Sequence, residues 1–172
     1  MNAQHDRVDY TTKETAAALR RALREAFPGV RFSVRMARGT AYGWLDVAYV
    51  DGPTWEQVRA ITNGFQSRTF DGRDDTYKSI EPTLYAREDG SLYEIRWSCC
   101  GINSQRTYSP EVEAWAATVA VPGSYWWPRG VAAWRDNPDA AVRDLLSGLD
   151  LTHGLPEDPR TAWKDRWQRA SD

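Results

Sequence analysis

The spacing of apolar residues changes abruptly where a Pro-Gly pair follows Phe27, and this change constrains the fold more than any other feature of the chain. Before the pair, Leu19, Leu23 and Phe27 recur every four residues, as on one face of an α-helix. After it, apolar and polar residues alternate over residues 30–36, as in a half-buried strand. Because Pro-Gly ends helices, the sequence predicts a helix joined by a turn to a strand.

Two capping-box patterns predict where helices begin. Thr11 is followed three residues later by Glu14, and Thr54 is followed three residues later by Gln57. Between these helices, apolar residues alternate again over residues 44–50, which predicts a second strand and a hairpin with the first.

The rest of the chain repeats the same two patterns. We expect strands within 77–85, 92–99 and 105–108, a helix from Pro110 to residue 121, and further helices after Asn137 and after Pro159. We therefore predict an α+β fold in which a small antiparallel sheet, in the order α-β-β-α-β-β, packs against helices and carries a helical C-terminal extension.

Composition and length set the expected organisation. The 172 residues suit one domain, which we place at residues 11–121, after a disordered tail at 1–10 and before an aromatic-rich segment with C-terminal helices at 122–172, packed on the same domain. A net charge of −2 argues against attraction of the whole chain to nucleic acid or an anionic membrane. No apolar run reaches the roughly 20 residues of a membrane span and no leader is visible, so we expect a cytoplasmic protein.

Motifs for catalysis are absent from the sequence. It contains no phosphate-binding glycine loop, no Gly-x-Ser-x-Gly elbow and no His-Glu-x-x-His pair, so we expect a protein without catalytic residues or a cofactor. One acidic cluster, Asp71, Asp74 and Asp75, supports the alternative of a metal-dependent hydrolase or nuclease, because paired carboxylates serve both metal binding and general-base catalysis. The spacing fits no calcium loop and is also ordinary turn chemistry, so we favour a solvated loop.

The two cysteines, Cys99 and Cys100, are adjacent, which makes a disulfide between them strained. We expect two reduced thiols. His5 and His153 are not at ligand spacing from them, so we expect no metal site and no Cys-His nucleophile.

Two sets of residues are candidates for binding. The first combines the aromatic and arginine side chains that dominate protein interfaces, and it predicts a protein partner: Trp44, Tyr125, Trp126, Trp127 and Arg129.

The second set is basic and lies on the first helix and the hairpin: Arg20, Arg24, Arg31, Arg35 and Arg38. It supports the alternative of nucleic-acid binding, with an affinity that falls steeply with salt. A surface paired with neighbouring acids is the simpler interpretation of the same residues.

Three motifs occur in order along the chain: Ala-Phe-Pro-Gly-Val-Arg-Phe-Ser-Val at 26–34, Val-Asp-Gly-Pro-Thr at 50–54 and Phe-Asp-Gly at 70–72. Together they resemble the large polyvalent protein-associated domains, over about residues 11–111. The resemblance implies an accessory protein of a phage, plasmid or conjugative element, also found in actinobacterial genomes, that protects the element's DNA or interferes with a host factor. It implies no catalytic residues. We therefore expect a non-enzymatic binding protein that acts through the hairpin face and the segment around Trp126.

Overall fold

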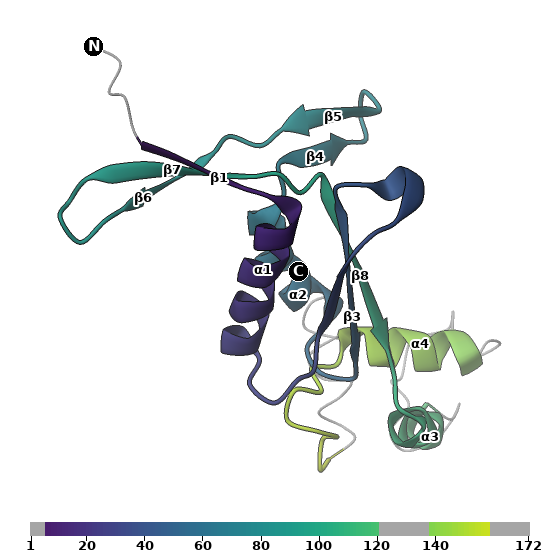
Figure 1. The fold of residues 1–172 in the computed structure, drawn as a ribbon. Coiled ribbons are helices and arrows are strands. Elements are labelled where there is room, and N and C mark those ends of the chain that lie inside the picture. The colour runs from purple at the N-terminus through teal and green to yellow at the C-terminus, as the bar shows by residue number, and fades with distance from the viewer. Residues whose placement is uncertain (1–5, 121–137, 159–172) are drawn as a thin grey trace. The chain divides into compact units, whose positions relative to one another are not determined.

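The computed structural model describes residues 6–120 and 138–158 (Figure 1). Its helices and strands, in chain order, are β1 (Asp6–Tyr10), α1 (Thr12–Ala26), β2 (Ser33–Met36), β3 (Trp44–Val50), α2 (Trp55–Thr62), β4 (Arg68–Asp71), β5 (Thr76–Ser79), β6 (Thr83–Ala86), β7 (Leu92–Trp97), β8 (Gly101–Thr107), α3 (Pro110–Val119) and α4 (Pro138–Gly148). The predicted α+β class is confirmed, with α3 and α4 as C-terminal helices. The strand order is richer than predicted, because β1 and β4 add to the expected elements and the strand expected within 77–85 is two strands, β5 and β6.

The described chain divides into two compact units. The first contains the described residues up to Ala48 together with Val58–Gln105, and the second contains Tyr49–Gln57 together with the described residues from Arg106 onward. The division into 11–121 and 122–172 stays a prediction.

The first unit is built on a three-stranded sheet in the order β2-β3-β8. Strands β2 and β3 are antiparallel, with Val34 opposite Val47. Strand β8 runs parallel to β3, because the bonding partners advance together from Gly43 with Cys100 to Asp46 with Asn103. The sheet is therefore mixed, with the predicted antiparallel pair β2-β3 and a parallel neighbour, β8.

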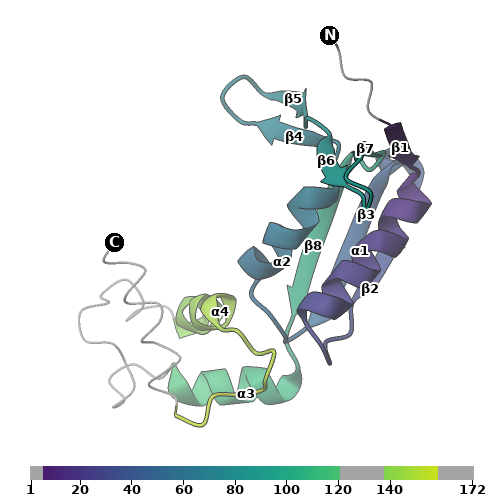
Figure 2. The ribbon, with the colours of Figure 1, turned by 90° about the vertical axis from the view of Figure 1, so that its left-hand side faces the viewer.

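Helices α1 and α2 lie on the same side of this sheet (Figures 1 and 2). Leu19 and Leu23 on α1, together with Leu45 and Val47 on β3, are at most 1% exposed. Burial of each such side chain stabilises the fold by about 1.5–3 kcal/mol. The Thr11–Glu14 capping box begins α1 as predicted, with both reciprocal hydrogen bonds present.

A second sheet in this unit has the order β1-β7-β6. Strand β1 pairs in parallel with β7, with Asp9 beside Arg96. The centroids of the Tyr10 and Trp97 rings lie 4.7 Å apart. The expectation of a disordered tail was therefore wrong for residues 6–10. Val8 and Tyr10 alternate with polar residues there, but a strand this short is stable only because β7 offers it an edge.

The second unit has its own apolar core between α3 and α4, and its buried members are Val112, Ala116, Val119, Ala120, Ala141, Leu145, Leu146, Leu149 and Leu151. Arg106 binds the adjoining turns. Its guanidinium donates to four backbone carbonyls at 2.7–3.1 Å, those of Asp51, Gly52, Leu146 and Leu149. One side chain thus ties the turn after β3 to the C-terminal end of α4.

The Val-Asp-Gly-Pro-Thr motif has a structural role in the same unit. Asp51 has a left-handed φ of 55°, and its carboxylate accepts the Ser109 N–H at 2.9 Å at the start of α3. Thr54 and Gln57 form the predicted capping box at the start of α2, with hydrogen bonds of 2.7 and 3.2 Å. The motif therefore fixes the starts of two helices.

Candidate functional site

One face of the β2-β3-β8 sheet is not covered by any element of the first unit (Figures 1 and 2). Because successive strand residues point to opposite faces, this face carries the residues that alternate with the buried ones. We call it the open face and define it by Ser33, Arg35, Trp44, Asp46, Ala48, Asn103 and Gln105. All except Trp44 line one shallow depression.

Trp44 is the first residue of β3 and lies at that end of the open face. The residue is half-buried, and its ring lies directly on Gly101 of β8. A Cβ added at Gly101 would meet the ring Cζ3 at 2.5 Å, so this position requires glycine. Part of Trp44 is thus held by the sheet and part faces solvent, while its predicted contact with a partner stays a prediction.

The open face carries both signs of charge. Arg35 on β2 lies opposite Asp46 on β3, and Asp46 accepts a hydrogen bond from the Asn103 amide at 3.2 Å. The remaining polar groups are neutral hydroxyl and amide side chains. This face therefore offers hydrogen-bonding groups without a net field for a polyanion.

The five predicted nucleic-acid-binding arginines do not gather on one face. Arg20 on α1 donates to the Val34 carbonyl at 2.5 Å, and Arg24 donates to the Arg20 carbonyl at 3.2 Å, so both lie on the helix side of the sheet. Arg35 points to the open face instead. The exposed Arg31 and Arg38 lie in the segments before and after β2.

The other predicted protein-binding residues lie outside the described residues. These are Tyr125, Trp126, Trp127 and Arg129, and their role stays a prediction.

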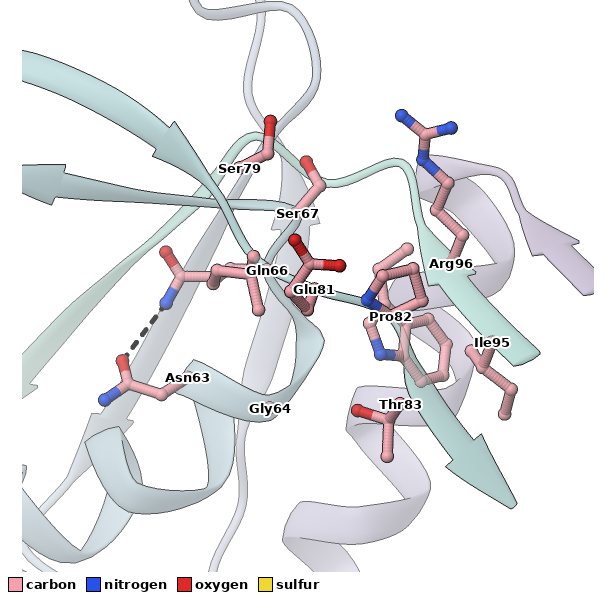
Figure 3. Close-up of a pocket in the computed structure, with 12 residues that line it drawn as sticks. Asn63, Gly64, Gln66, Ser67, Ser79, Glu81, Pro82, Thr83, Ile95 and Arg96 are labelled. Carbon is pink, nitrogen blue, oxygen red and sulfur yellow. Dashed lines mark hydrogen bonds between the residues drawn. The ribbon is translucent and has the colours of Figure 1, made fainter. Parts of the chain in front are cut away.

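A groove that the sequence analysis did not single out lies where β4, β5 and β7 meet (Figure 3). Two adjoining depressions share the lining residues Ser67, Ser79, Arg96 and Trp97. One of them also contains Arg7 and Arg68. We call the combined surface the arginine groove. Its arginines come from β1, β4 and β7, so no local spacing in the sequence could have indicated it.

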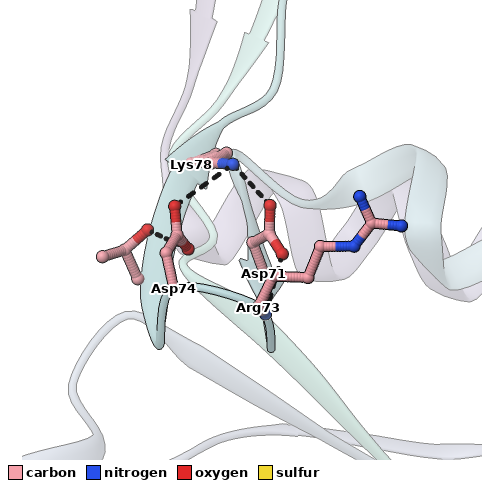
Figure 4. Close-up of polar contacts among 5 residues, drawn as sticks. Asp71, Arg73, Asp74 and Lys78 are labelled. Atoms are coloured by element: carbon pink, nitrogen blue, oxygen red, sulfur yellow. Dashed lines mark hydrogen bonds and ion pairs between the residues drawn. The ribbon is translucent and has the colours of Figure 1, made fainter.

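The acidic cluster lies on the exposed β4-β5 hairpin (Figure 4). The Lys78 ammonium pairs with Asp71 and, at 3.4 Å, with Asp74. Hydrogen bonds from Lys78 and from the Arg73 backbone N–H lower the pKa of Asp71. A hydrogen bond from the Thr76 hydroxyl is the main cause that lowers the pKa of Asp74.

These carboxylates lie on an exposed hairpin, as expected for the favoured solvated loop, and their surroundings do not support the alternative of a hydrolase or nuclease centre. Asp75 occupies the turn with a φ of 54°, and the lowered pKa values of Asp71 and Asp74 make both carboxylates weaker bases, whereas an effective general base has a pKa closer to neutral pH. In residues 6–120 and 138–158, no group of three or more His, Cys, Asp or Glu side chains is placed to hold a metal ion. The acidic cluster is better described as a hairpin stabilised by Lys78.

The cysteines are free thiols, as predicted. Burial raises the pKa of Cys99 to about 11, and its thiol donates to the Gly101 carbonyl at 3.2 Å. Cys100 is half-buried, and a Cβ added at Gly43 would lie 3.2 Å from its sulfur. A thiol with a raised pKa is a poor nucleophile, so Cys99 acts in packing.

Within the described part of the chain, every helix falls short of the length and hydropathy that a bilayer span requires.

Comparison with known proteins places the chain in a family. The model described as large polyvalent protein associated domain 29 matches residues 10–109, which is more than half of the 172-residue chain. No curated protein and no solved structure matches significantly. The matched region begins at the last residue of β1 and ends just before α3, so it contains the open face and the arginine groove except for Arg7 and Asp9.

Proposed function

Since the chain belongs to the large polyvalent protein associated domain 29 family, we propose that it is a non-enzymatic accessory protein of a phage or other mobile element that binds a protein partner through its open face. The family suggests the association with a mobile element. The binding surface is our inference from the sheet face that no described element of the first unit covers, and this is the single observation that carries the proposal.

The chemistry of the open face suits a protein more than a nucleic acid. Arg35 and Asp46 cancel in charge, whereas nucleic-acid affinity depends on an excess of cations. Ser33, Asn103 and Gln105 offer hydroxyl and amide groups of the kind that form the hydrogen bonds of protein interfaces. Trp44 at one end is a residue type that often dominates interface energetics.

A charge placed at the centre of the open face tests the proposal. Ala48 is exposed in β3, so Ala48→Arg adds bulk and charge to the face without disturbing a buried side chain. Ala17 is exposed on α1, which makes Ala17→Arg a matched control with the same chemical change in the same unit. Both variants are compared with the unmodified protein as baits in lysate of a host cell, at low and high salt and with nuclease.

We expect a nuclease-resistant protein partner that Ala48→Arg loses and Ala17→Arg keeps. Equal recovery by all three baits would refute the role of the open face. Recovery of nucleic acid that is sensitive to nuclease and salt, and that is lost when Arg31 and Arg35 are reversed in charge, would instead support the basic-surface alternative.

A further inference from the structure

The arginine groove shares no lining residue with the open face. It combines two different chemistries in adjoining halves. The half that contains Arg7, Arg68 and Arg96 is cationic, whereas the half lined by Asn63, Gln66 and Glu81 presents amides and one carboxylate. A ligand that fits the whole groove must therefore carry an anionic group next to a group with hydrogen-bond donors.

The cationic half has a positive excess. Arg7 is neutralised by Asp9, to which its Nε and Nη2 atoms donate at 3.0 and 2.9 Å. Arg68 and Arg96 form no ion pair within the described residues, and both are exposed. These two free guanidinium groups are planar forks of donors, which match the oxygens of a phosphate group.

Hydroxyl groups complete the anion-binding character of this half. Ser79 and Ser98 line it, and in the part of the chain described here their hydroxyls form no hydrogen bond. Figure 3 shows the side chains of Ser67, Ser79 and Arg96 pointing to the same side of the groove. A phosphate bound there would receive hydrogen bonds from at least two strands, which fixes its position.

The other half has the complementary chemistry. Asn63 and Gln66 are joined by a hydrogen bond of 3.2 Å, so each keeps further amide capacity for a ligand (Figure 3). Glu81 forms no hydrogen bond or ion pair with any described residue. A carboxylate accepts hydrogen bonds from amino groups, such as the exocyclic amine of a nucleobase.

This combination discriminates between ligand classes. An acidic peptide would satisfy Arg68 and Arg96, but its further carboxylates would be repelled by Glu81. A nucleotide carries its phosphate and an amino-bearing base on one sugar, so it satisfies both halves at once. We propose that the arginine groove binds a nucleotide, with its phosphate on Arg68 and Arg96 and an amino-bearing base at Glu81.

The nucleotide can be free or part of a single strand, and the test separates these sources. Binding is measured by calorimetry with inorganic phosphate, CMP, UMP and an oligomer of deoxycytidines at low and moderate salt. We expect CMP to bind more tightly than inorganic phosphate or UMP, because cytosine has the amino group that Glu81 accepts and uracil does not. An oligomer that binds more tightly than CMP, with a steep salt dependence, identifies a strand; affinity equal to that of CMP identifies the free nucleotide.

Matched variants decide whether the groove is the site. Arg68→Gln and Arg96→Gln should each weaken CMP binding by about ten-fold, since each removes a charge-assisted donor from an exposed position. Arg73→Gln makes the same change at an exposed position on the neighbouring hairpin turn and should leave binding unchanged. Glu81→Gln should abolish the preference for CMP over UMP.

Absence of CMP binding would overturn the proposal, as would equal losses in Arg73→Gln and Arg96→Gln. Inorganic phosphate that binds as tightly as CMP would overturn the assignment of the base. Circular dichroism of each variant confirms that the fold is retained, so that a lost interaction is not a lost structure.

Discussion

Removal of the Arg106 guanidinium should destabilise the second unit more than any other single change at a polar side chain there. We consider Arg106→Met, which keeps an unbranched apolar stem and removes every donor. Four carbonyls lose the Arg106 donor, at original distances of 2.7–3.1 Å, while those of Gly52 and Leu146 each keep a backbone N–H as a second partner. The cation–π contact with Tyr108, at 4.9 Å from the ring centroid, is lost as well.

The magnitude follows from these contacts. Each hydrogen bond contributes about 1 kcal/mol net, and the exposed part of the cluster allows water to replace some of them. The aromatic contact adds about 0.5–1 kcal/mol. We therefore expect a loss of about 3–5 kcal/mol in the free energy of unfolding, which is a large share of the roughly 5–15 kcal/mol of an ordinary domain.

Urea unfolding followed by circular dichroism and by tryptophan fluorescence measures this loss. Arg106→Lys should recover little, because an ammonium cannot reach four carbonyls in the geometry of the guanidinium fork. Arg143→Met on the exposed side of α4 is the matched control and should change stability by less than about 0.5 kcal/mol. A loss below about 1 kcal/mol in Arg106→Met would refute the reasoning.

Two further predictions concern the first unit. Thr11→Ala should lower its stability by about 1 kcal/mol in urea unfolding, because it removes the N-cap of α1. Hydrogen bonds from Thr11 lower the pKa of Glu14, so the part of this stabilisation that comes from the ionised Glu14 carboxylate is present at neutral pH and is lost as the pH falls through the folded-state pKa. A loss of stability in Thr11→Ala that is equal at neutral and acid pH would contradict this pH dependence. A thiol reagent near neutral pH should modify Cys100 well before Cys99, whose buried thiol has a pKa raised to about 11, and mass spectrometry that finds both labelled at one rate would exclude this order.

Local sequence patterns predicted the elements whose signals are local. The capping boxes at Thr11 and Thr54 begin helices as expected, and the alternation over residues 44–50 is strand β3 with Leu45 and Val47 buried. These predictions succeeded because helix caps and period-two burial depend on residues within one turn or one strand.

Elements that depend on distant partners were not predictable in the same way. Strand β1 is short and half polar, and it forms because β7 pairs with it in parallel from about 90 residues away. Strands β4 to β6 are almost entirely exposed and lack the burial pattern that identifies a strand, so β4 was missed and the one strand expected within 77–85 is two, β5 and β6.

The candidate sites also differ in whether their residues are close together in the sequence. The sequence indicated Trp44 and Arg35 near the hairpin, but the arginine groove requires Arg7, Arg68 and Arg96 to converge from three strands. For the acidic cluster the sequence favoured a solvated loop, but it did not indicate that Lys78, on the returning strand of the same hairpin, pairs with Asp71 and Asp74.

The most direct test of the proposed function is site-specific photo-crosslinking from the open face. A photoreactive amino acid is placed at Ala48 in one protein and, as the control, at Ala17 in another, and both are irradiated inside the host cell. We predict a discrete protein adduct from position 48 that is absent from position 17. Identical adduct patterns from the two positions, or no adduct from position 48, would contradict the claim that the open face binds a protein partner.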